Sequence, residues 1–212
     1  KNLVPPRESQ VEPFLEMIEK VWMDTYTAEV GQQTLRSYIP KQLLLVGSAS
    51  YNDDGSTTEG TAEGGRQIVL YSVNDFNFEL EQIQSYAHVM HHEFAHILHQ
   101  NVEYDAEFEK ITPSYSSSWM QMNDETARSK GFITAYAFSS ADEDFAEMVS
   151  IMLTNSPEDW DNMIENAGNA AAVEALRKKE AIVVAYMKNN WGVNMKDFQK
   201  EVVAAIEAAV RN

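Results

Sequence analysis

The stretch HVMHHEFAHILHQN, residues 88–101, holds all five histidines of the 212-residue chain. The spacing of apolar residues predicts one helix from about Glu79 to Gln100. At about 100° per residue, four histidines fall on one side of this helix: His88, His92, His96 and His99. The opposite side carries apolar residues: Met90, Phe94, Ile97 and Leu98. We therefore expect a core face and a histidine face, with His91 lying off the histidine face as a structural residue.

Two of these histidines belong to an H-E-x-x-H motif formed by His92, Glu93 and His96. Residues four apart on a helix lie one turn apart on the same face, so two imidazoles there can bind one zinc ion. The adjacent glutamate can then act as general base on a water molecule. The alternative is a protein without metal, whose histidines are satisfied by hydrogen bonds. The complete motif on a periodic helix favours one Zn²⁺ ion, with His92 and His96 as ligands.

A catalytic zinc needs a third protein ligand and an open position. His99 lies two turns after His92 on an uninterrupted helix, so it is poorly placed to share the ion. In metzincins a glycine breaks the helix after the second histidine, whereas here Ile97 and Leu98 continue it. The metzincin pattern is therefore excluded. We expect His99, like His88, to lie beside the metal ligands and not to bind the metal.

A carboxylate on a later helix is the other source of the third ligand. The sequence predicts a helix from about Asp142 to Leu153, with Ser140 as its N-cap. Glu143 and Glu147 share one face of it, so one could bind zinc while the other hydrogen-bonds a ligand imidazole. However, Ser140 and Glu143 also form an S-x-x-E capping box. On the residues alone, both interpretations of Glu143 and the neighbouring aspartates remain open.

Composition narrows the class of protein. The formal net charge of −17 disfavours binding to nucleic acid or to anionic membranes, because both carry negative charge. The chain has no cysteine, which excludes disulfides, thiol catalysis and cysteine metal ligands. No apolar run approaches the roughly 20 residues that a transmembrane helix needs. These features are typical of a folded protein with a solvated, acidic surface.

The N-terminal half mixes helix and strands. Residues 11–27 have helical periodicity, with Pro13 expected in the first turn. Two strands are predicted, at 42–49 and 66–73, and we expect them to pair as an antiparallel hairpin. Their connection, 52–65, is rich in turn residues and is expected to be an exposed, mobile loop.

From residue 158 onward the pattern predicts three helices, the clearest at 170–189 and 196–210. We therefore predict an α+β fold in a single domain, residues 1–212. Its first lobe, 1–101, would carry a small sheet and the H-E-x-x-H helix. Its second lobe, 102–212, would be mainly helical.

The motifs resemble those of gluzincins, zinc peptidases whose third ligand is a glutamate on a later helix. The stretch YAFSSADEDFAE, 136–147, is also similar to the catalytic motif of the anthrax lethal-factor family. That resemblance implies that Glu143 is the zinc ligand and that Glu147 supports a ligand imidazole. It also implies that Tyr136 stabilises the oxyanion, although an ordinary packing role for this tyrosine stays open. Glu147 departs from thermolysin-like gluzincins, which have an aspartate there.

Over most of its length the chain resembles the zinc-binding metallopeptidase lipoproteins of Gram-negative gut bacteria, also described as substrate import-associated zinc metallohydrolases. The residues that carry the resemblance are HHEFAHILHQ, 91–100, and the block at 131–147. It implies a zincin-like fold and a metallopeptidase acting on a peptide or protein substrate. It also implies a lipid-anchored location outside the inner membrane, at the outer membrane or in the periplasm, and a possible outer-membrane import complex. The alternative function is non-catalytic binding of a peptide or glycan within such a complex.

Overall fold

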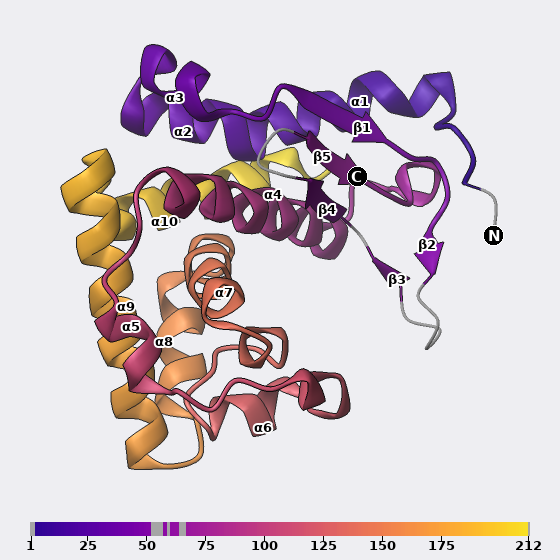
Figure 1. Cartoon of the computed structure of the whole chain (residues 1–212). Helices are drawn as coiled ribbons and strands as arrows, with labels where there is room; N and C mark the ends of the chain where they lie inside the picture. The colour runs from indigo at the N-terminus through magenta and orange to yellow at the C-terminus, as the bar shows by residue number, and fades with distance from the viewer. Residues whose placement is uncertain (1–2, 52–56, 59, 64–66, 212) are drawn as a thin grey trace. The chain divides into compact units, whose positions relative to one another are not determined.

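The computed structural model describes residues 3–51, 57–58, 60–63 and 67–211, and the chain divides into two units (Figure 1). Unit 1 is Lys1–Ile97 together with Ala204–Asn212, and unit 2 is Leu98–Val203. Helices predominate, and the described strands all lie in unit 1. The α+β prediction is therefore confirmed. The division into lobes 1–101 and 102–212 stays a prediction.

Unit 1 begins with a nearly continuous helical run. It consists of α1 (Glu8–Ile18), the π-helix η1 (Glu19–Asp24), α2 (Thr25–Val30) and α3 (Gln32–Tyr38). The helix expected over 11–27 is present, but it begins earlier, so the placement of Pro13 in the first turn is wrong. Pro13 lies in the helix interior, where it has no N–H for the carbonyl four residues earlier. The helix persists there because Phe14, Met17 and Ile18 are buried on one face.

The sheet differs from the predicted hairpin. Strand β1 (Gln42–Leu45) pairs with β5 (Gln67–Leu70) in parallel, so the expected antiparallel pairing is wrong. The reason is β4 (Gly60–Glu63), which pairs antiparallel with the other edge of β5 and gives the order β1-β5-β4. Because β4 turns back into β5, the chain enters β5 in the same direction as β1.

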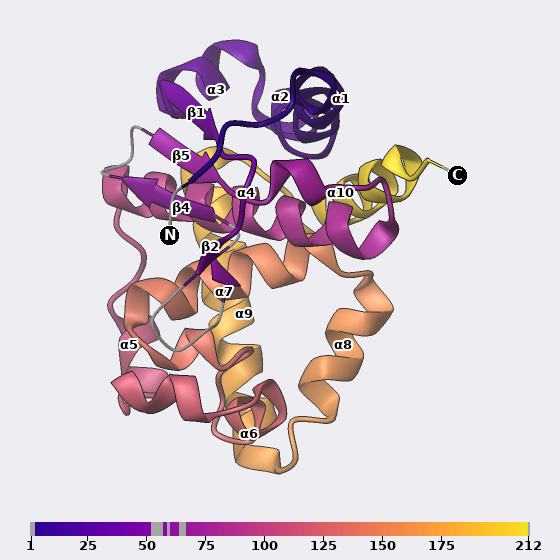
Figure 2. The same cartoon turned by 90° about the vertical axis from the view of Figure 1, so that its right-hand side faces the viewer.

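The connection between these strands also contains more structure than expected. Short strands β2 (Ser50–Tyr51) and β3 (Thr57–Thr58) pair antiparallel (Figure 2). Within 52–65, the expectation of an irregular loop is therefore wrong for β3 and β4. The rest of that stretch, 52–56, 59 and 64–65, lies outside the described residues.

Helix α4 (Leu80–Asn101) carries the histidines, and its apolar face is buried as predicted. In unit 1, the Phe94 ring meets the rings of Trp22 and Tyr26 edge-on, with centroids 5.4 and 4.7 Å apart. Further along, Tyr86 and Phe14 make a similar contact at 4.9 Å. These aromatic contacts hold the N-terminal helices against α4 and fix the rotation of α4 about its axis.

Unit 2 is helical, and side-chain caps begin its main helices. Ser140 accepts a hydrogen bond from the Glu143 N–H at the start of α7, as predicted, and Ser156 and Asn169 cap α8 and α9 in the same way. The elements of the unit are α5 (Glu107–Ile111), the 3-10 helix η3 (Ser117–Gln121), α6 (Asp124–Arg128), the 3-10 helix η4 (Tyr136–Phe138), α7 (Ala141–Thr154), α8 (Pro157–Glu165), α9 (Ala170–Trp191) and most of α10 (Met195–Ala209). The three C-terminal helices confirm the prediction from the sequence. Every helix in the described part of the chain is too short or too polar to cross a membrane.

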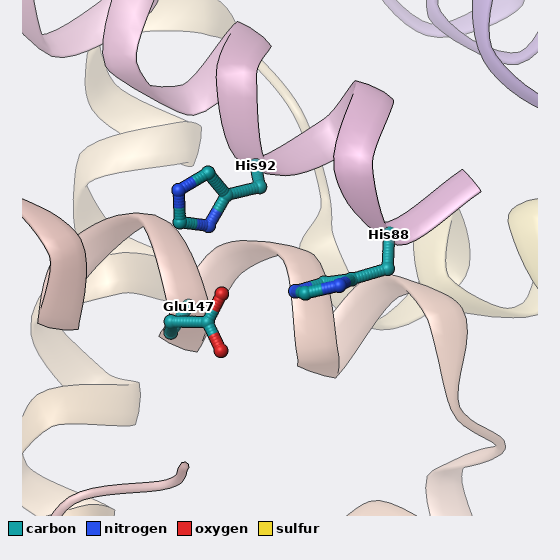
Figure 3. A group of neighbouring side chains, drawn as sticks. All are labelled: His88, His92 and Glu147. Carbon is teal, nitrogen blue, oxygen red and sulfur yellow. The ribbon is translucent and has the colours of Figure 1, made fainter. Parts of the chain in front are cut away.

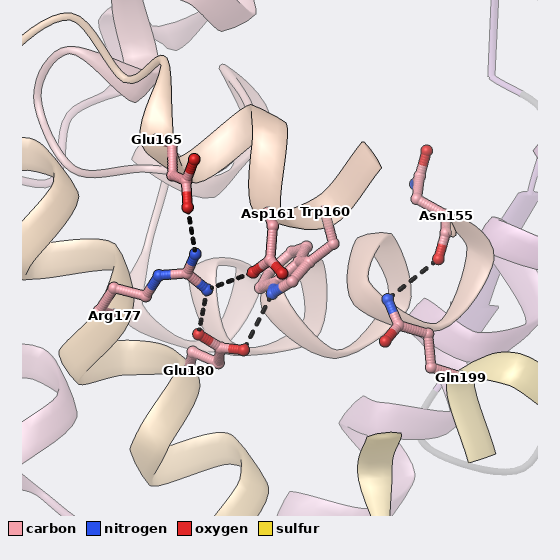
Figure 4. A network of polar contacts seen from close by, with 7 residues as sticks. All are labelled: Asn155, Trp160, Asp161, Glu165, Arg177, Glu180 and Gln199. Atoms are coloured by element: carbon pink, nitrogen blue, oxygen red, sulfur yellow. Dashed lines mark hydrogen bonds and ion pairs between the residues drawn. The ribbon is translucent and has the colours of Figure 1, made fainter. Parts of the chain in front are cut away.

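A polar network joins α8 to α9 (Figure 4). The Trp160 Nε1–H donates to Glu180 at 3.1 Å, and Arg177 reaches both Glu180 and Asp161 at 2.8 Å. Trp160 and Glu180 are buried, so their hydrogen bond fixes how the two helices pack.

Candidate metal and catalytic site

The two motif histidines lie close together on α4. The Nε2 atoms of His92 and His96 lie 3.1 Å apart, and their rings are nearly perpendicular. Two nitrogens that each lie 2.0–2.1 Å from a tetrahedral zinc ion would be separated by about 3.3 Å. The separation therefore fits two ligands that face one metal position. The adjacent Glu93 is half-buried on the same helical turn.

His88 lies one turn before His92 on the same side of α4 (Figure 3), with ring centroids 5.8 Å apart. We call His88, His92, Glu93 and His96 the α4 group. The structure thus places three histidines of unit 1 along one face, as the helical wheel predicted.

His91 is separate from this face. It is fully buried, and its Nε2–H donates to the Val21 carbonyl at 3.2 Å. Burial lowers the pKa of His91 from 6.5 to about 3, although the hydrogen bond to Val21 opposes this shift. His91 is therefore a neutral core residue, in agreement with its expected structural role.

In unit 2, the two glutamates with predicted roles lie one turn apart on α7; we call Glu143 and Glu147 the α7 group. Glu147 is buried, and its carboxylate accepts a hydrogen bond from the Thr134 hydroxyl at 2.6 Å. The same Thr134 oxygen accepts from the Ala137 N–H at 3.1 Å. These contacts fix the Glu147 carboxylate from outside α7. Glu143 is half-buried at the capped end of the helix.

The neighbouring aspartates are engaged within unit 2. Asp142 accepts a 2.7 Å hydrogen bond from the Tyr104 hydroxyl, and burial together with this carboxylate raises the pKa of Tyr104. Asp144 is fully buried against Lys179, at 2.5 Å. Burial raises the pKa of Asp144 to about 6, while Lys179 acts in the opposite direction. Both aspartates thus take part in the internal packing of unit 2.

Tyr136 lies at the first residue of η4, and 38% of it is exposed. Its ring meets Trp119 edge-on, with centroids 4.9 Å apart. An exposed phenol supported on one side by a second aromatic ring is accessible to a substrate. The oxyanion role predicted for Tyr136 stays a prediction.

His99, at the end of α4, belongs to unit 2. It is buried between the rings of Tyr104 and Phe145, at centroid distances of 5.5 and 6.0 Å. This contact joins the last turn of α4 to α7. A direct role for His99 beside the metal stays a prediction.

Three supporting residues were not identified from the sequence: Thr134, Trp119 and Lys179. Thr134 lies in an irregular segment and Trp119 in the short 3-10 helix η3, and neither segment is long enough for periodicity to show which side chains meet. Lys179 had a usable signal, because it follows Leu176 by three residues and precedes Val183 by four, on the buried face of α9.

The chain is similar to a protein of known structure. A crystal structure of a "putative zinc-binding metallo-peptidase" from Bacteroides caccae ATCC 43185 matches with a TM-score of 0.85 and 33% identity. The match covers 98% of this chain and 80% of that chain. Among curated proteins the comparison finds no match.

The similar structure and the matching family support a metallohydrolase. The model of a family described as "putative zinc-binding metallo-peptidase" matches residues 1–196, and the chain belongs to that family. Among the residues that the structure describes, those in groups that could hold a metal ion are His88, His92 and His96 on α4, and Glu143 and Glu147 on α7.

Proposed function

We propose that this protein is a zinc-dependent peptidase of the gluzincin type, in which His92, His96 and Glu143 hold one zinc ion. The observation that carries the proposal is the 3.1 Å separation of the two histidine Nε2 atoms. It matches the ligand spacing of a tetrahedral zinc site. The ligand chemistry also fits, because imidazole and carboxylate are both common zinc ligands.

Two observations support Glu143 as the third ligand. Asp142 and Asp144 take part in contacts with Tyr104 and Lys179, whereas Glu143 belongs to a group of side chains that could hold a metal ion. In addition, His99 contacts Phe145 within unit 2. The last turn of α4 is thereby packed against α7 within unit 2.

In this proposal the chain's own residues position the substrate and move the proton. A bound zinc ion would polarise the scissile carbonyl and make a water molecule more acidic. Glu93 accepts the proton of the attacking water and passes it to the leaving amine nitrogen. Tyr136 donates its phenolic hydrogen to the oxyanion of the tetrahedral intermediate.

Glu147 has a supporting role in the same proposal. Its carboxylate receives the Thr134 hydrogen bond and has a second oxygen with which to orient a ligand imidazole. Such a carboxylate fixes the tautomer of the histidine and raises its basicity.

The wider setting is also proposed. The substrate is a peptide or protein, and the protein acts outside the inner membrane, lipid-anchored at the outer membrane or in the periplasm, where it could serve an import complex. The resemblance of the H-E-x-x-H and 131–147 stretches supports this setting. A peptide substrate suits the strongly acidic chain better than a nucleic acid does.

Two variants test the proposal. Glu93→Gln should retain bound zinc but lose peptide cleavage by a factor of about 10² or more, because only the proton acceptor is removed. Glu143→Ala should lose zinc affinity as well. Zinc content is measured by mass spectrometry, and cleavage is measured on a mixed peptide library.

Normal cleavage by Glu93→Gln would refute the mechanism. If the wild-type protein binds zinc and peptides but cleaves nothing in the library, the non-catalytic binding function replaces the peptidase. If the protein binds no zinc when it is purified and reloaded, the metal site itself is wrong.

A further inference from the structure

Lys179 of α9 is a fully buried lysine with partners in two other segments of unit 2. Its Nζ donates to the Gly131 carbonyl at 2.8 Å and to the Asp144 carboxylate at 2.5 Å. It also lies over the Phe132 ring, 4.1 Å from the centroid. The buried ammonium group therefore has two hydrogen-bond acceptors and two aromatic rings, Phe132 and, at 5.6 Å, Phe108, all on chain segments outside α9.

Both segments carry residues of the candidate site. Gly131 begins the stretch that leads to Thr134 and Tyr136, and Asp144 directly follows Glu143. Lys179 thus connects the segment that holds the tyrosine and the partner of Glu147 to the first turn of α7.

The backbone of Gly131 packs closely against helix α9. Gly131 has a positive φ of 86°, and a Cβ there would lie 2.9 Å from the Ala175 side chain and 3.0 Å from that of Thr112. Glycine is therefore required both by conformation and by space. Its backbone is pressed against α9, where its carbonyl can reach Lys179.

Tyr115 completes the environment of the aspartate, because its hydroxyl donates to the same Asp144 oxygen at 3.0 Å. The carboxylate is thus fixed from two directions, and Glu143, one residue earlier on the same helical turn, is fixed with it.

We propose that Lys179 is a positioning residue for the metal and catalytic site, and this inference rests on the proposed function. A buried ion pair is a weak source of net stability, because removing both charges from water offsets most of their attraction. Its contribution here is geometric: one ammonium group sets where the Tyr136 segment lies relative to Glu143. Lys179 itself contacts neither substrate nor metal.

The experiment compares Lys179→Met with Glu180→Met. Both variants change a buried charged residue of α9 to methionine at adjacent positions, but Glu180 connects α9 to α8 through Trp160 (Figure 4). Zinc affinity is measured by competition with a chromophoric chelator. Amide hydrogen exchange is measured by mass spectrometry on peptides covering 131–147 and 157–165.

We expect Lys179→Met to weaken zinc binding about tenfold or more, the effect typical of lost supporting contacts around a metal. Exchange should become faster in 131–147 and stay unchanged in 157–165. Glu180→Met should show the opposite exchange pattern and bind zinc as the wild type does. Equal zinc affinities in the two variants would overturn the proposal, as would unchanged exchange in 131–147.

If Lys179→Met does not fold, Asp144→Asn is used in its place. This variant keeps the Lys179–Gly131 hydrogen bond, so the expected loss of zinc affinity is smaller than in Lys179→Met, and wild-type affinity would overturn the proposal. If the wild-type protein binds no zinc, the proposed function fails. The exchange comparison alone then decides whether Lys179 orders the 131–147 segment.

Discussion

Replacing His91 with glutamine is expected to change how stability depends on pH. In the wild type, burial lowers the pKa of His91 to about 3, below the value of 6.5 in the unfolded chain. Between these pH values the unfolded chain binds more protons than the folded chain. Stability is therefore fully present above pH 6.5 and is lost as the pH falls toward 3.

The size of the change in unfolding free energy follows from the lowered pKa of His91. Each pH unit below 6.5 removes up to about 1.4 kcal/mol of unfolding free energy, so the loss through His91 is about 2 kcal/mol at pH 5. Glutamine cannot titrate, but its amide can still donate to the Val21 carbonyl. At pH 8 we expect His91→Gln to be less stable than the wild type, because the buried ring is lost. Between pH 8 and pH 5, however, the variant should lose about 2 kcal/mol less unfolding free energy than the wild type, because glutamine does not titrate.

Urea unfolding at pH 8, 6 and 5, followed by circular dichroism in the presence of a chelator, measures this difference. All other titrating groups are shared by the two proteins, so their contributions cancel in the comparison. Parallel stability curves for the wild type and His91→Gln would refute the account of a neutral, buried His91.

Three further predictions concern the candidate site. Tyr136→Phe should lower kcat by a factor of about 10² with little change in KM, because it removes one oxyanion donor; a changed KM with normal kcat would instead indicate a packing or binding role. Thr134→Val should weaken zinc binding at least about tenfold in chelator competition, because Glu147 loses its partner, and unchanged affinity would contradict that role. Removing zinc with a chelator should lower Tm in the wild type but not in His92→Ala/His96→Ala, since only a protein that binds the metal is stabilised by it; equal shifts in both would contradict the ligand assignment.

Helix α4 was predictable because its pattern is long and periodic. Its 22 residues form one apolar face and one histidine face. The apolar face is buried in the structure. Helix α7 was predictable from its cap, since Ser140 does accept the Glu143 N–H. Local hydrogen bonding and periodicity thus sufficed to place the α4 group and the α7 group on their helices.

The sheet was not predictable in the same way. Strands β1 and β5 have four residues each, and nothing in such short apolar runs encodes their relative direction. Direction depended on β4, whose sequence GTAE has little strand character. The segment Gly60–Glu63 is a strand because it pairs with β5 and not because of its own residues.

The contact partners of the side chains that support the site were also hidden in the sequence, even where burial of the side chain had a signal. Lys179 lies in the run RKKE, 177–180, which is typical of a solvated helix surface, yet it is fully buried. Its partners Gly131 and Asp144 are 48 and 35 residues away. A contact of that kind is determined by how α9 packs, and no local pattern indicates it.

The central claim is that two histidines of α4 and a glutamate of α7 bind one zinc ion. X-ray absorption spectroscopy at the zinc edge, on the wild type and on Glu143→Ala, tests it most directly. We predict two imidazole nitrogens at about 2.0–2.1 Å, one carboxylate oxygen and a remaining position open to water in the wild type, with the carboxylate lost in the variant. A sphere of three or more imidazoles, or the same sphere in both proteins, would contradict the account.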